Sequence, residues 1–319
     1  MKMKQDALTS NTLVCRTGLK SRIAKDFKKN SSLYLLAIPI IIYYVVFVIA
    51  PLCGTVIAFQ NYSLTKGVFG SKFVGFKHFL DFFDSMYFFR VVKNTLVISI
   101  TQILVEFPAP VILALLINEV KSKHYSRTVQ TITYLPHFIS LVVLCGIVRD
   151  FTASDGIIGS VVAAITGEDV NMLTQRGWFV PIYVLSGIWQ GVGWGSIVYL
   201  AALTSLDASL YEAASLDGAG RWKQFVHVTI PGILPTVITM LIMRIGRMTS
   251  VGSEKILLLY NQNIYETADV ISTFVYRKGM LEQNYGFSTA VGLFNSVINC
   301  AFLIAANYAS KKINGTALW

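Results

Sequence analysis

A short polar segment, residues 209–220, carries the side chains that are best spaced for a specific task. It separates two long apolar runs, so in a chain this hydrophobic it must lie at a membrane face. Ser209 followed three residues later by Glu212 has the form of a capping box, in which both side chains accept hydrogen bonds from unpaired N–H groups at a helix start. Gly218 tolerates the left-handed conformation that ends a helix. We therefore expect a helix of about two turns, too short to be stable alone and suited to docking.

One face of the predicted helix carries only small side chains, because Ala213 and Ala214 are adjacent. The backbone of another protein can therefore approach it closely. The alternative is an ordinary capped loop helix in which Glu212 caps and does nothing more. These residues alone leave both interpretations open.

The wider spacing resembles the EAA loop of membrane subunits in binding-protein-dependent ABC importers. Its pattern is Glu-Ala-Ala, three residues, Gly, nine residues, an aliphatic, one residue, an aliphatic and Pro, filled here by Glu212-Ala213-Ala214, Gly218, Val228, Ile230 and Pro231. In that family the loop forms the coupling helix, which inserts into a cleft of the ATP-hydrolysing subunit. The resemblance implies that Glu212 meets a basic residue of that subunit, that Gly218 sets the turn and that Pro231 starts the next span, with Ala213, Ala214 and Asp217 completing the coupling loop.

Composition places the chain in a bilayer. Of 319 residues 54% are hydrophobic and 14% are charged, with a mean hydropathy of +0.58, far from a soluble average. The net charge of +10 comes from Lys and Arg beside apolar runs, so we expect a topological role and no nucleic-acid partner. The four cysteines have no close spacing, which favours neither a disulfide framework nor a metal site.

Six apolar runs are long enough to span a membrane as helices, and they predict an all-α membrane protein. They are residues 33–59 and about 93–118, 131–150, 180–204, 227–248 and 288–309. We expect a basic segment at 1–32, a transmembrane permease domain at 33–310 with a coupling loop at about 207–226, and a tail at 311–319. A short surface helix is expected around 157–165, and the apolar patch 256–260 is too short to cross and can re-enter between helices.

Orientation follows from the distribution of Lys and Arg. Fifteen lie in the N-terminal segment, the tail and the two connections on their side, against nine in the opposite connections. The positive-inside rule therefore places both termini and the segment around Glu212 in the cytoplasm.

The span at 180–204 combines small residues with aromatic and amide side chains. Gly187, Gly191 and Gly195 recur every four residues, which allows close helix approach, and packing within the same subunit is favoured over packing against a partner. Trp189, Gln190 and Trp194 suit a sugar, whose C–H face stacks on a ring while its hydroxyls need donors and acceptors. Interfacial anchoring of the tryptophans is the alternative.

Other spans carry polar residues that must face protein or water. Glu106 follows Asn94 and Gln102 along one helical stripe and is either a hydrogen-bond hub or a pathway residue. Arg244 and Arg247 share a face near the outer end of their span, where they either snorkel to the headgroups or bind the carboxylate of an acidic sugar. Asn295 and Asn299 form a four-residue pair, for which hydrogen bonding between helices is the plain explanation.

No phosphate-binding Gly-x-x-x-x-Gly-Lys-Ser/Thr occurs, so we expect no catalytic residue, metal or cofactor in this chain. The resemblance implies a type I ABC importer permease in a bacterial inner membrane. It also implies a second, homologous permease subunit, two ATPase subunits that hold ATP and Mg, and an extracytoplasmic sugar-binding protein. The outer connection, with Ile256 to Tyr260 and Tyr265 to Val270, looks like that of oligosaccharide and polysaccharide permeases, including uronide and alginate importers. The alternative is a stand-alone secondary transporter or channel.

We predict that Glu212→Ala weakens association with the ATPase, or its coupling to transport, while the protein still inserts in the membrane. Losing one partner of a buried charged pair costs about 2–5 kcal/mol, enough to uncouple the two subunits. Uptake by vesicles that contain the assembled complex measures the effect, and unchanged uptake would reject this role of Glu212.

Overall fold

The computed structural model describes residues 29–167 and 171–319, so most of the expected basic segment 1–32 lies outside the described residues. The chain divides into two units, residues 1–55 and 56–319. In the first, helix α2 (Ser31–Tyr44) continues through a π-helical stretch (Val45–Ile49) into α3 (Ala50–Cys53), and none of these side chains is buried. A helix that is apolar on all sides needs lipid or another protein around it.

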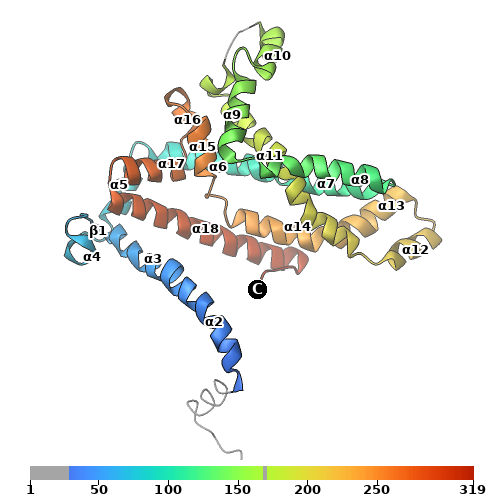
Figure 1. The fold of residues 1–319 in the computed structure, drawn as a ribbon, viewed down its shortest axis with the longest axis horizontal. Coiled ribbons are helices and arrows are strands. Elements are labelled where there is room, and N and C mark those ends of the chain that lie inside the picture. Colours follow the sequence, from blue (N-terminus) through green and yellow to red (C-terminus); the bar gives the residue numbers. More distant parts are fainter. Residues whose placement is uncertain (1–28, 168–170) are drawn as a thin grey trace, which may run out of the picture. The chain divides into compact units, whose positions relative to one another are not determined.

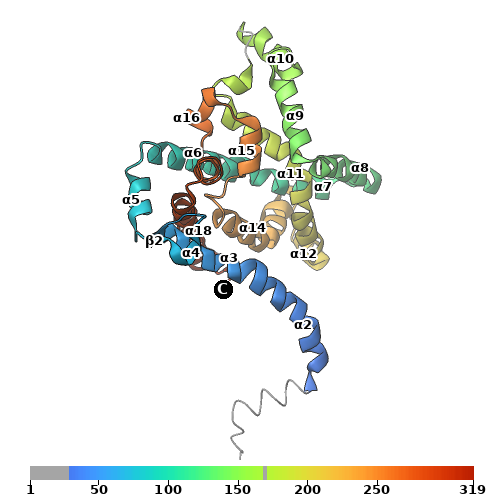
Figure 2. The ribbon, with the colours of Figure 1, turned by 60° about the vertical axis from the view of Figure 1, so that its left-hand side comes forward.

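The second unit is almost entirely helical (Figures 1 and 2). Its first part contains a small antiparallel hairpin of β1 (Gln60–Asn61) and β2 (Lys72–Phe73), with Gln60 opposite Phe73, around α4 (Gly67–Gly70), followed by α5 (Lys77–Phe83). The long helices follow as α6 (Phe88–Thr101), α7 (Pro108–Glu119), α8 (Lys123–Tyr134), α9 (Leu141–Thr152), α10 (Ile157–Thr166) and α11 (Phe179–Thr204). The remainder comprises α12 (Ala208–Leu216), α13 (Arg221–Gln224), α14 (Ile230–Ile245), α15 (Ser253–Leu259), α16 (Tyr265–Ala268), α17 (Ile271–Tyr276) and α18 (Tyr285–Asn314).

Four helices of the described chain are long and apolar enough to cross a membrane, namely Ser31–Phe59, Phe88–Glu119, Arg221–Ile245 and Tyr285–Ile313. A bent pair, Lys123–Phe138 with Leu141–Thr166, makes a fifth if it counts as one span. Helix α11 is continuous over 26 residues, but its glycines and Gln190 make it less apolar than these. Each predicted run therefore contains a long helix or a bent pair.

The run 131–150, predicted as one span, is bent by 100°. Pro136 lies in the 3₁₀ turn Leu135–Phe138, and Ile139 and Ser140 are extended. Ser140 then begins α9, because its side chain accepts a hydrogen bond from the Val143 N–H at 3.4 Å. A proline and a capping serine thus end one helix and start the next in a new direction. Helices α9 and α10 project away from the long helices in both ribbon views (Figures 1 and 2).

Helix α12 occupies the polar segment, but its cap differs from the prediction. The N-cap is Asp207, whose carboxylate accepts a hydrogen bond from the Ser209 N–H at 2.9 Å. The predicted capping box of Ser209 and Glu212 is wrong, because the helix begins one residue before Ser209 and leaves Glu212 free of a capping role. At the other end Gly218 is left-handed, with φ of +74°.

Pro231 does not start the fifth span, which is a second correction. The helix begins at Arg221 and passes through a π-helical stretch, Phe225–Thr229, directly before α14. Proline lacks an N–H and clashes with the carbonyl one turn before it, and the widened π turn accommodates both effects. The proline therefore shapes the helix without ending it.

The largest core cluster packs α15 against α9 and α11. Ile256 and Leu259 of α15 are buried beside Leu144, Phe179 and Val184. The apolar patch 256–260 thus forms a short helix inside the protein, as the sequence suggested for a segment too short to cross. The short helix predicted around 157–165 is confirmed as α10.

Asp269 organises the connection between α14 and α18. Its side chain is fully buried and accepts hydrogen bonds from Arg90 (3.0 Å), Arg277 (2.7 Å) and Thr273 (2.9 Å). Asn94 of α6 donates to the carbonyl oxygen of Asp269 at 3.0 Å. One carboxylate therefore ties α6 to α17 and compensates two guanidinium groups that are largely withdrawn from water.

We predict that Asp269→Asn lowers the stability of the folded chain by about 2–5 kcal/mol, because it leaves two part-buried guanidinium groups without a counter-ion. The midpoint of thermal unfolding in detergent measures the loss. Glu282→Gln is the matched control, since it removes an exposed ion pair with Lys278 (2.6 Å) and such pairs contribute about 1 kcal/mol or less. An equal midpoint for the two variants would contradict the prediction.

Candidate functional site

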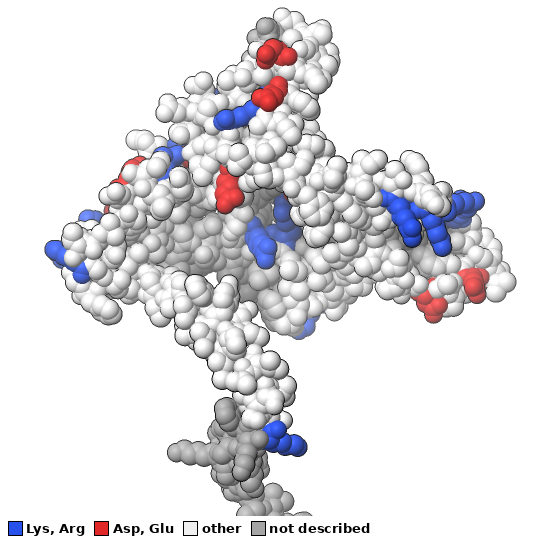
Figure 3. Space-filling view, in the orientation of Figure 1, with Lys and Arg blue, Asp and Glu red and all other residues white. Residues whose placement is uncertain are grey.

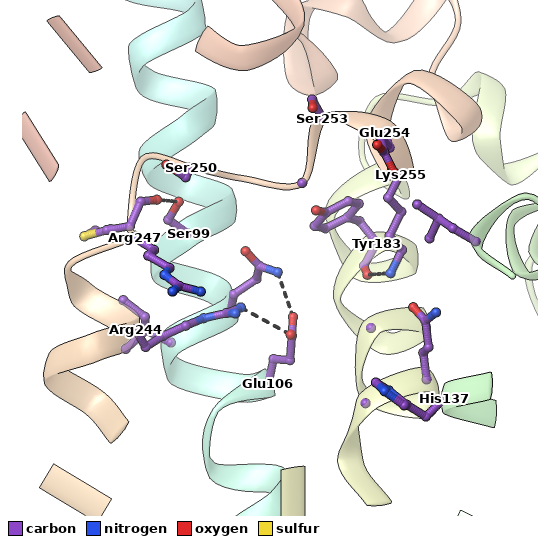
Figure 4. A pocket seen from close by; sticks show the side chains of 18 residues that line it. Ser99, Glu106, His137, Tyr183, Arg244, Arg247, Ser250, Ser253, Glu254 and Lys255 are labelled. Carbon is purple, nitrogen blue, oxygen red and sulfur yellow. Dashed lines mark hydrogen bonds and ion pairs between the residues drawn. The ribbon is translucent and has the colours of Figure 1, made fainter. Parts of the chain in front are cut away.

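A cavity of about 620 Å³ lies between α6, α11, α14 and α15 (Figure 4). Its lining combines three cations with two carboxylates and several hydroxyl and amide groups. The charged and polar lining residues are Ser99, Gln102, Glu106, His137, Tyr183, Gln190, Arg244, Arg247, Ser250, Ser253, Glu254 and Lys255. Basic side chains are visible within the central hollow of the space-filling view (Figure 3). A cavity with this lining can hold a polar, negatively charged solute.

Glu106 lines this cavity. It ends a π-helical stretch, Gln102–Glu106, that leads into the Pro108 turn of α7. One carboxylate oxygen accepts a hydrogen bond from the Gln102 amide at 2.8 Å, and the other pairs with Arg244 at 3.2 Å. Glu106 thus makes the two side-chain contacts expected of a structural hydrogen-bond hub. It also lines the cavity, as expected of a pathway residue.

Arg244 and Arg247 both face the cavity, on the side opposite Tyr183 and Lys255 (Figure 4). Arg244 is compensated by Glu106. Within the described residues no acidic side chain pairs with Arg247, which is exposed to the cavity. The geometry therefore differs from that of headgroup snorkelling, and it leaves one guanidinium group free to bind an anion.

Lys255 supplies the third cation, from α15. Its side chain is buried, its ammonium donates a hydrogen bond to the Tyr183 carbonyl oxygen at 2.9 Å, and it lies 4.7 Å from the centre of the Tyr183 ring. Gly187 separates this ammonium from Glu106. A Cβ on Gly187 would lie 3.1 Å from a Glu106 carboxylate oxygen and 3.4 Å from Lys255 Nζ.

A second cavity of about 320 Å³ adjoins the first and shares Glu106, Gly187, Gly191, Arg244 and Arg247 with it. The rest of its lining is mainly apolar and comes from the start of α7, from the half of α11 nearer α12 and from the last turns of α14, including Pro110, Val198, Tyr199, Met240 and Met243. The shared residues form the boundary between the two. We call the first, polar cavity the outer cavity, because it is farther from α12, and the second, apolar one the inner cavity.

The glycine stripe of α11 does more than pack helices. Gly195 lies against Pro110, where a Cβ would be 3.0 Å from the proline ring, whereas Gly191 faces open space. The closest helix approach is at Gly193, where a Cβ would lie 2.1 Å from the Thr133 carbonyl oxygen. The stripe thus leaves room for the two cavities, and Gly193, outside the predicted set, permits the tightest backbone contact with α8.

The three predicted sugar-contact residues of α11 lie in different surroundings. Gln190 lines the outer cavity. Trp194 stacks on His137, a cavity residue, with ring centres 4.6 Å apart and nearly parallel planes. Trp189 points elsewhere, into an apolar cavity with Ile147, Trp178 and Leu185 among its lining.

Asn295 and Asn299 of α18 lie behind the cavity wall. Asn299 accepts a hydrogen bond from the Thr249 N–H (2.9 Å) and donates to the Ser250 hydroxyl (2.9 Å). The Asn295 carbonyl oxygen accepts from the Thr249 hydroxyl at 3.4 Å. These contacts hold the segment that follows Arg247, but only the Asn299 side chain has the predicted helix-connecting geometry. Asn295 contributes its backbone carbonyl, and its side-chain Oδ1 is buried with no hydrogen-bond partner in the described part of the chain. Neither asparagine is among the cavity-lining residues.

The α12 segment has the exposure that docking requires. Glu212 and Ala213 are exposed, Ala214 is half-buried, and Glu212 has no ion pair within the described residues. Leu216 and Trp222 project into solvent with exposed fractions of 89% and 74%. Acidic and basic side chains gather at this end of the molecule (Figure 3).

Backbone hydrogen bonds and the Asp207 cap fix the two ends of α12, and the Glu212 side chain takes no part in them. The Ala219 N–H donates to the Ala214 carbonyl (2.9 Å) and the Gly218 N–H to that of Ser215 (3.1 Å), with Asp217 as C-cap. The hydrogen bond from Ser209 lowers the pKa of the Asp207 carboxyl below its ordinary value. The ionised cap is therefore kept at neutral pH and is lost only as the pH falls through that lowered pKa.

Sequence reasoning missed Tyr183, Lys255 and His137. Lys255 follows Glu254 in a connection that reads as an outer loop, and nothing local shows that it folds back against α11. The sequence did contain one signal for Lys255, which directly precedes the apolar run Ile256–Leu259. A lysine in a segment apolar enough to be buried needs a polar partner, and this need could have pointed to a site.

Residues 106–315 match the family described as binding-protein-dependent transport system inner membrane component. The polygalacturonan/rhamnogalacturonan transport system permease protein YteP of Bacillus subtilis (strain 168) is 39% identical over 310 residues, covering 97% of each chain. Two solved structures are each 43% identical. One is of a bacterial ABC transporter involved in the import of the acidic polysaccharide alginate (TM-score 0.84, covering 92% of this chain and 99% of that one). The other is of the bacterial alginate ABC transporter in complex with an alginate pentasaccharide-bound periplasmic protein (TM-score 0.86, covering 93% and 100%).

The fold and these matches define an inner membrane permease of the type I ABC importer class, which is a transporter component and not an enzyme. The chain belongs to the family of inner membrane components of binding-protein-dependent transport systems. The resemblance of the Glu212 to Pro231 spacing to this family is thereby confirmed, and a stand-alone secondary transporter is disfavoured.

Proposed function

We propose that this chain forms, together with a second permease subunit, the transmembrane pathway for an acidic oligosaccharide in an ATP-driven importer. The single observation that carries the acidic substrate is the outer cavity. Arg244, Arg247 and Lys255 outnumber Glu106 and Glu254 there, and Arg247 has no counter-ion within the described residues.

Charge balance supports this choice of substrate. A guanidinium group that lines a partly enclosed cavity costs free energy unless an anion or water compensates it, and arginine binds carboxylates through two parallel hydrogen bonds. A uronic acid supplies a carboxylate together with hydroxyls, which match the Ser250, Ser253 and Gln190 side chains. The names of the similar permease and transporters, which include polygalacturonan and alginate, support the same class.

Two ATPase subunits would supply the energy, with ATP and Mg bound on them. The exposed α12 carries the free carboxylate of Glu212 and the exposed side chain of Leu216, which together offer a charged and an apolar contact. An extracytoplasmic binding protein would deliver the sugar at the opposite end. Closure of the ATPases would then move α12, and alternating access would follow.

Both termini and α12 would lie in the cytoplasm, as the distribution of Lys and Arg indicates. Helix α2 is apolar on all sides, which fits a helix whose neighbours are lipid and the second permease subunit.

Competition for uptake by the assembled complex in vesicles tests the substrate class. Trigalacturonate should compete better than its fully methyl-esterified form, because esterification removes the carboxylate charges and adds only a methyl group to each carboxyl. Arg247→Gln should reduce competition by the acid about two- to tenfold, the range for a typical hydrogen bond of about 0.5–1.5 kcal/mol, because Arg247 is exposed, and leave the ester unaffected.

The same substitution at Arg149, which is exposed and outside the cavity, is the matched control. Equal competition by the acid and the ester in the unmodified complex would remove the charge argument.

A further inference from the structure

We propose that the Glu106–Arg244 ion pair is a charge-exchange gate between the two cavities, which the carboxylate of an acidic sugar opens by replacing Glu106 on Arg244. The proposal rests on the proposed function and adds a mechanism by which the pathway recognises its substrate. It assigns different tasks to the two arginines that sequence analysis treated as a pair.

The position of the pair carries the first step. Glu106 and Arg244 line both cavities, the outer polar one and the inner apolar one nearer α12. Their 3.2 Å contact joins α14 to the end of the π-helical stretch before α7. The contact therefore lies at the boundary between the two cavities, beside the way from one to the other.

The strength of the pair allows exchange. The Arg244 and Glu106 side chains have exposed fractions of 39% and 23%, so both are accessible from the cavity. The contact is a single hydrogen bond, Arg244 Nη2 to one Glu106 oxygen, whereas a carboxylate that enters freely can approach a guanidinium group in the bidentate geometry. Ion pairs of this exposure contribute little net stability, and a substrate carboxylate can compete for Arg244.

Glu106 keeps polar neighbours when its ion pair with Arg244 is broken. Its second oxygen keeps the Gln102 hydrogen bond at 2.8 Å. On the other side of Gly187 lies the Lys255 ammonium, and both groups are within 3.4 Å of the point where a Cβ of Gly187 would stand. Lys255 donates only to a backbone carbonyl at 2.9 Å, so it can take over Glu106 as a partner.

Arg247 has the complementary task. It has no acidic partner among the described residues and lines the same boundary. It can attract the sugar carboxylate before any exchange, and Arg244 then accepts that carboxylate in place of Glu106. Figure 4 shows the two guanidinium groups above one another on one wall, with Glu106 between them and the Tyr183–Lys255 wall.

A neutral sugar cannot perform this exchange, because a hydroxyl does not replace the charge of Glu106. The gate would therefore discriminate by charge after the binding protein has made its own selection. This gives the permease a second, independent filter for the same property.

Uptake kinetics of the assembled complex in vesicles test the gate, with trigalacturonate and its methyl ester as probes. Glu106→Gln keeps an oxygen for the Gln102 hydrogen bond but removes the charge that holds Arg244. The apparent KM for trigalacturonate should fall about two- to fivefold, the gain from removing one partly exposed competing ion pair, while the KM for the ester stays unchanged.

The double variant Glu106→Gln/Arg244→Gln separates the gate from a general electrostatic effect. If Glu106 acts through Arg244, the KM effect of Glu106→Gln disappears in the Arg244→Gln background, as coupled residues require. The matched control is Glu282→Gln, which breaks an ion pair outside the cavity and should change neither KM.

Two outcomes overturn the proposal and are distinct from a failure of the proposed function. An unchanged trigalacturonate KM in Glu106→Gln, with acid preference intact in the unmodified complex, rejects the gate alone. An equal fall of KM with or without Arg244 also rejects it. A lack of acid preference in the unmodified complex instead rejects the acidic substrate.

Discussion

Charges in an apolar bundle must be compensated, and the way this chain compensates them decides where its helices meet. Asp269 is withdrawn from water completely and holds Arg90 and Arg277, which fixes the outer connection on α6. Glu106 and Arg244 are only partly withdrawn and make one contact. The first arrangement is costly to break because no water can replace the lost partner. The second can rearrange, because the cavity supplies water or a solute in its place.

Helix α11 connects the cavity to α12, the segment that we propose docks on an ATPase subunit. Tyr183 and Gly187 line the outer chamber near its beginning, and it runs without a break to Thr204. Three residues later Asp207 caps α12. A displacement of α12 by a partner subunit therefore reaches the cavity wall through one continuous helix and a short, hydrogen-bonded turn.

Irregular helical stretches coincide with the places where side chains must be aimed. The π-helical stretch Gln102–Glu106 presents Glu106 to the cavity, and a second one, Phe225–Thr229, precedes Pro231. A π turn inserts an extra residue and so rotates the side chains that follow it. The glycines have a related effect, since Gly193 brings α11 against the backbone of α8 while Gly191 leaves open space.

The sequence by itself determined the class of the protein and its helical segments, because hydropathy, helix length and the Glu212 to Pro231 spacing are local properties. It also identified Glu106, Arg244 and Arg247 as polar residues that need a partner or water. Only the tertiary structure decided which partner each one has. Gly187 of α11 lies against Glu106, and Lys255 of α15 donates to the Tyr183 carbonyl of α11, and no sequence period encodes such contacts.

Tertiary packing also changed two local predictions. Asp207, two residues before Ser209, competes for the helix cap, and the run 131–150 bends where Pro136 and Ser140 lie close together. Local patterns name the residues that can cap or break a helix. Which of several neighbouring residues caps or breaks the helix depends on the direction that the next segment of the chain follows in the fold.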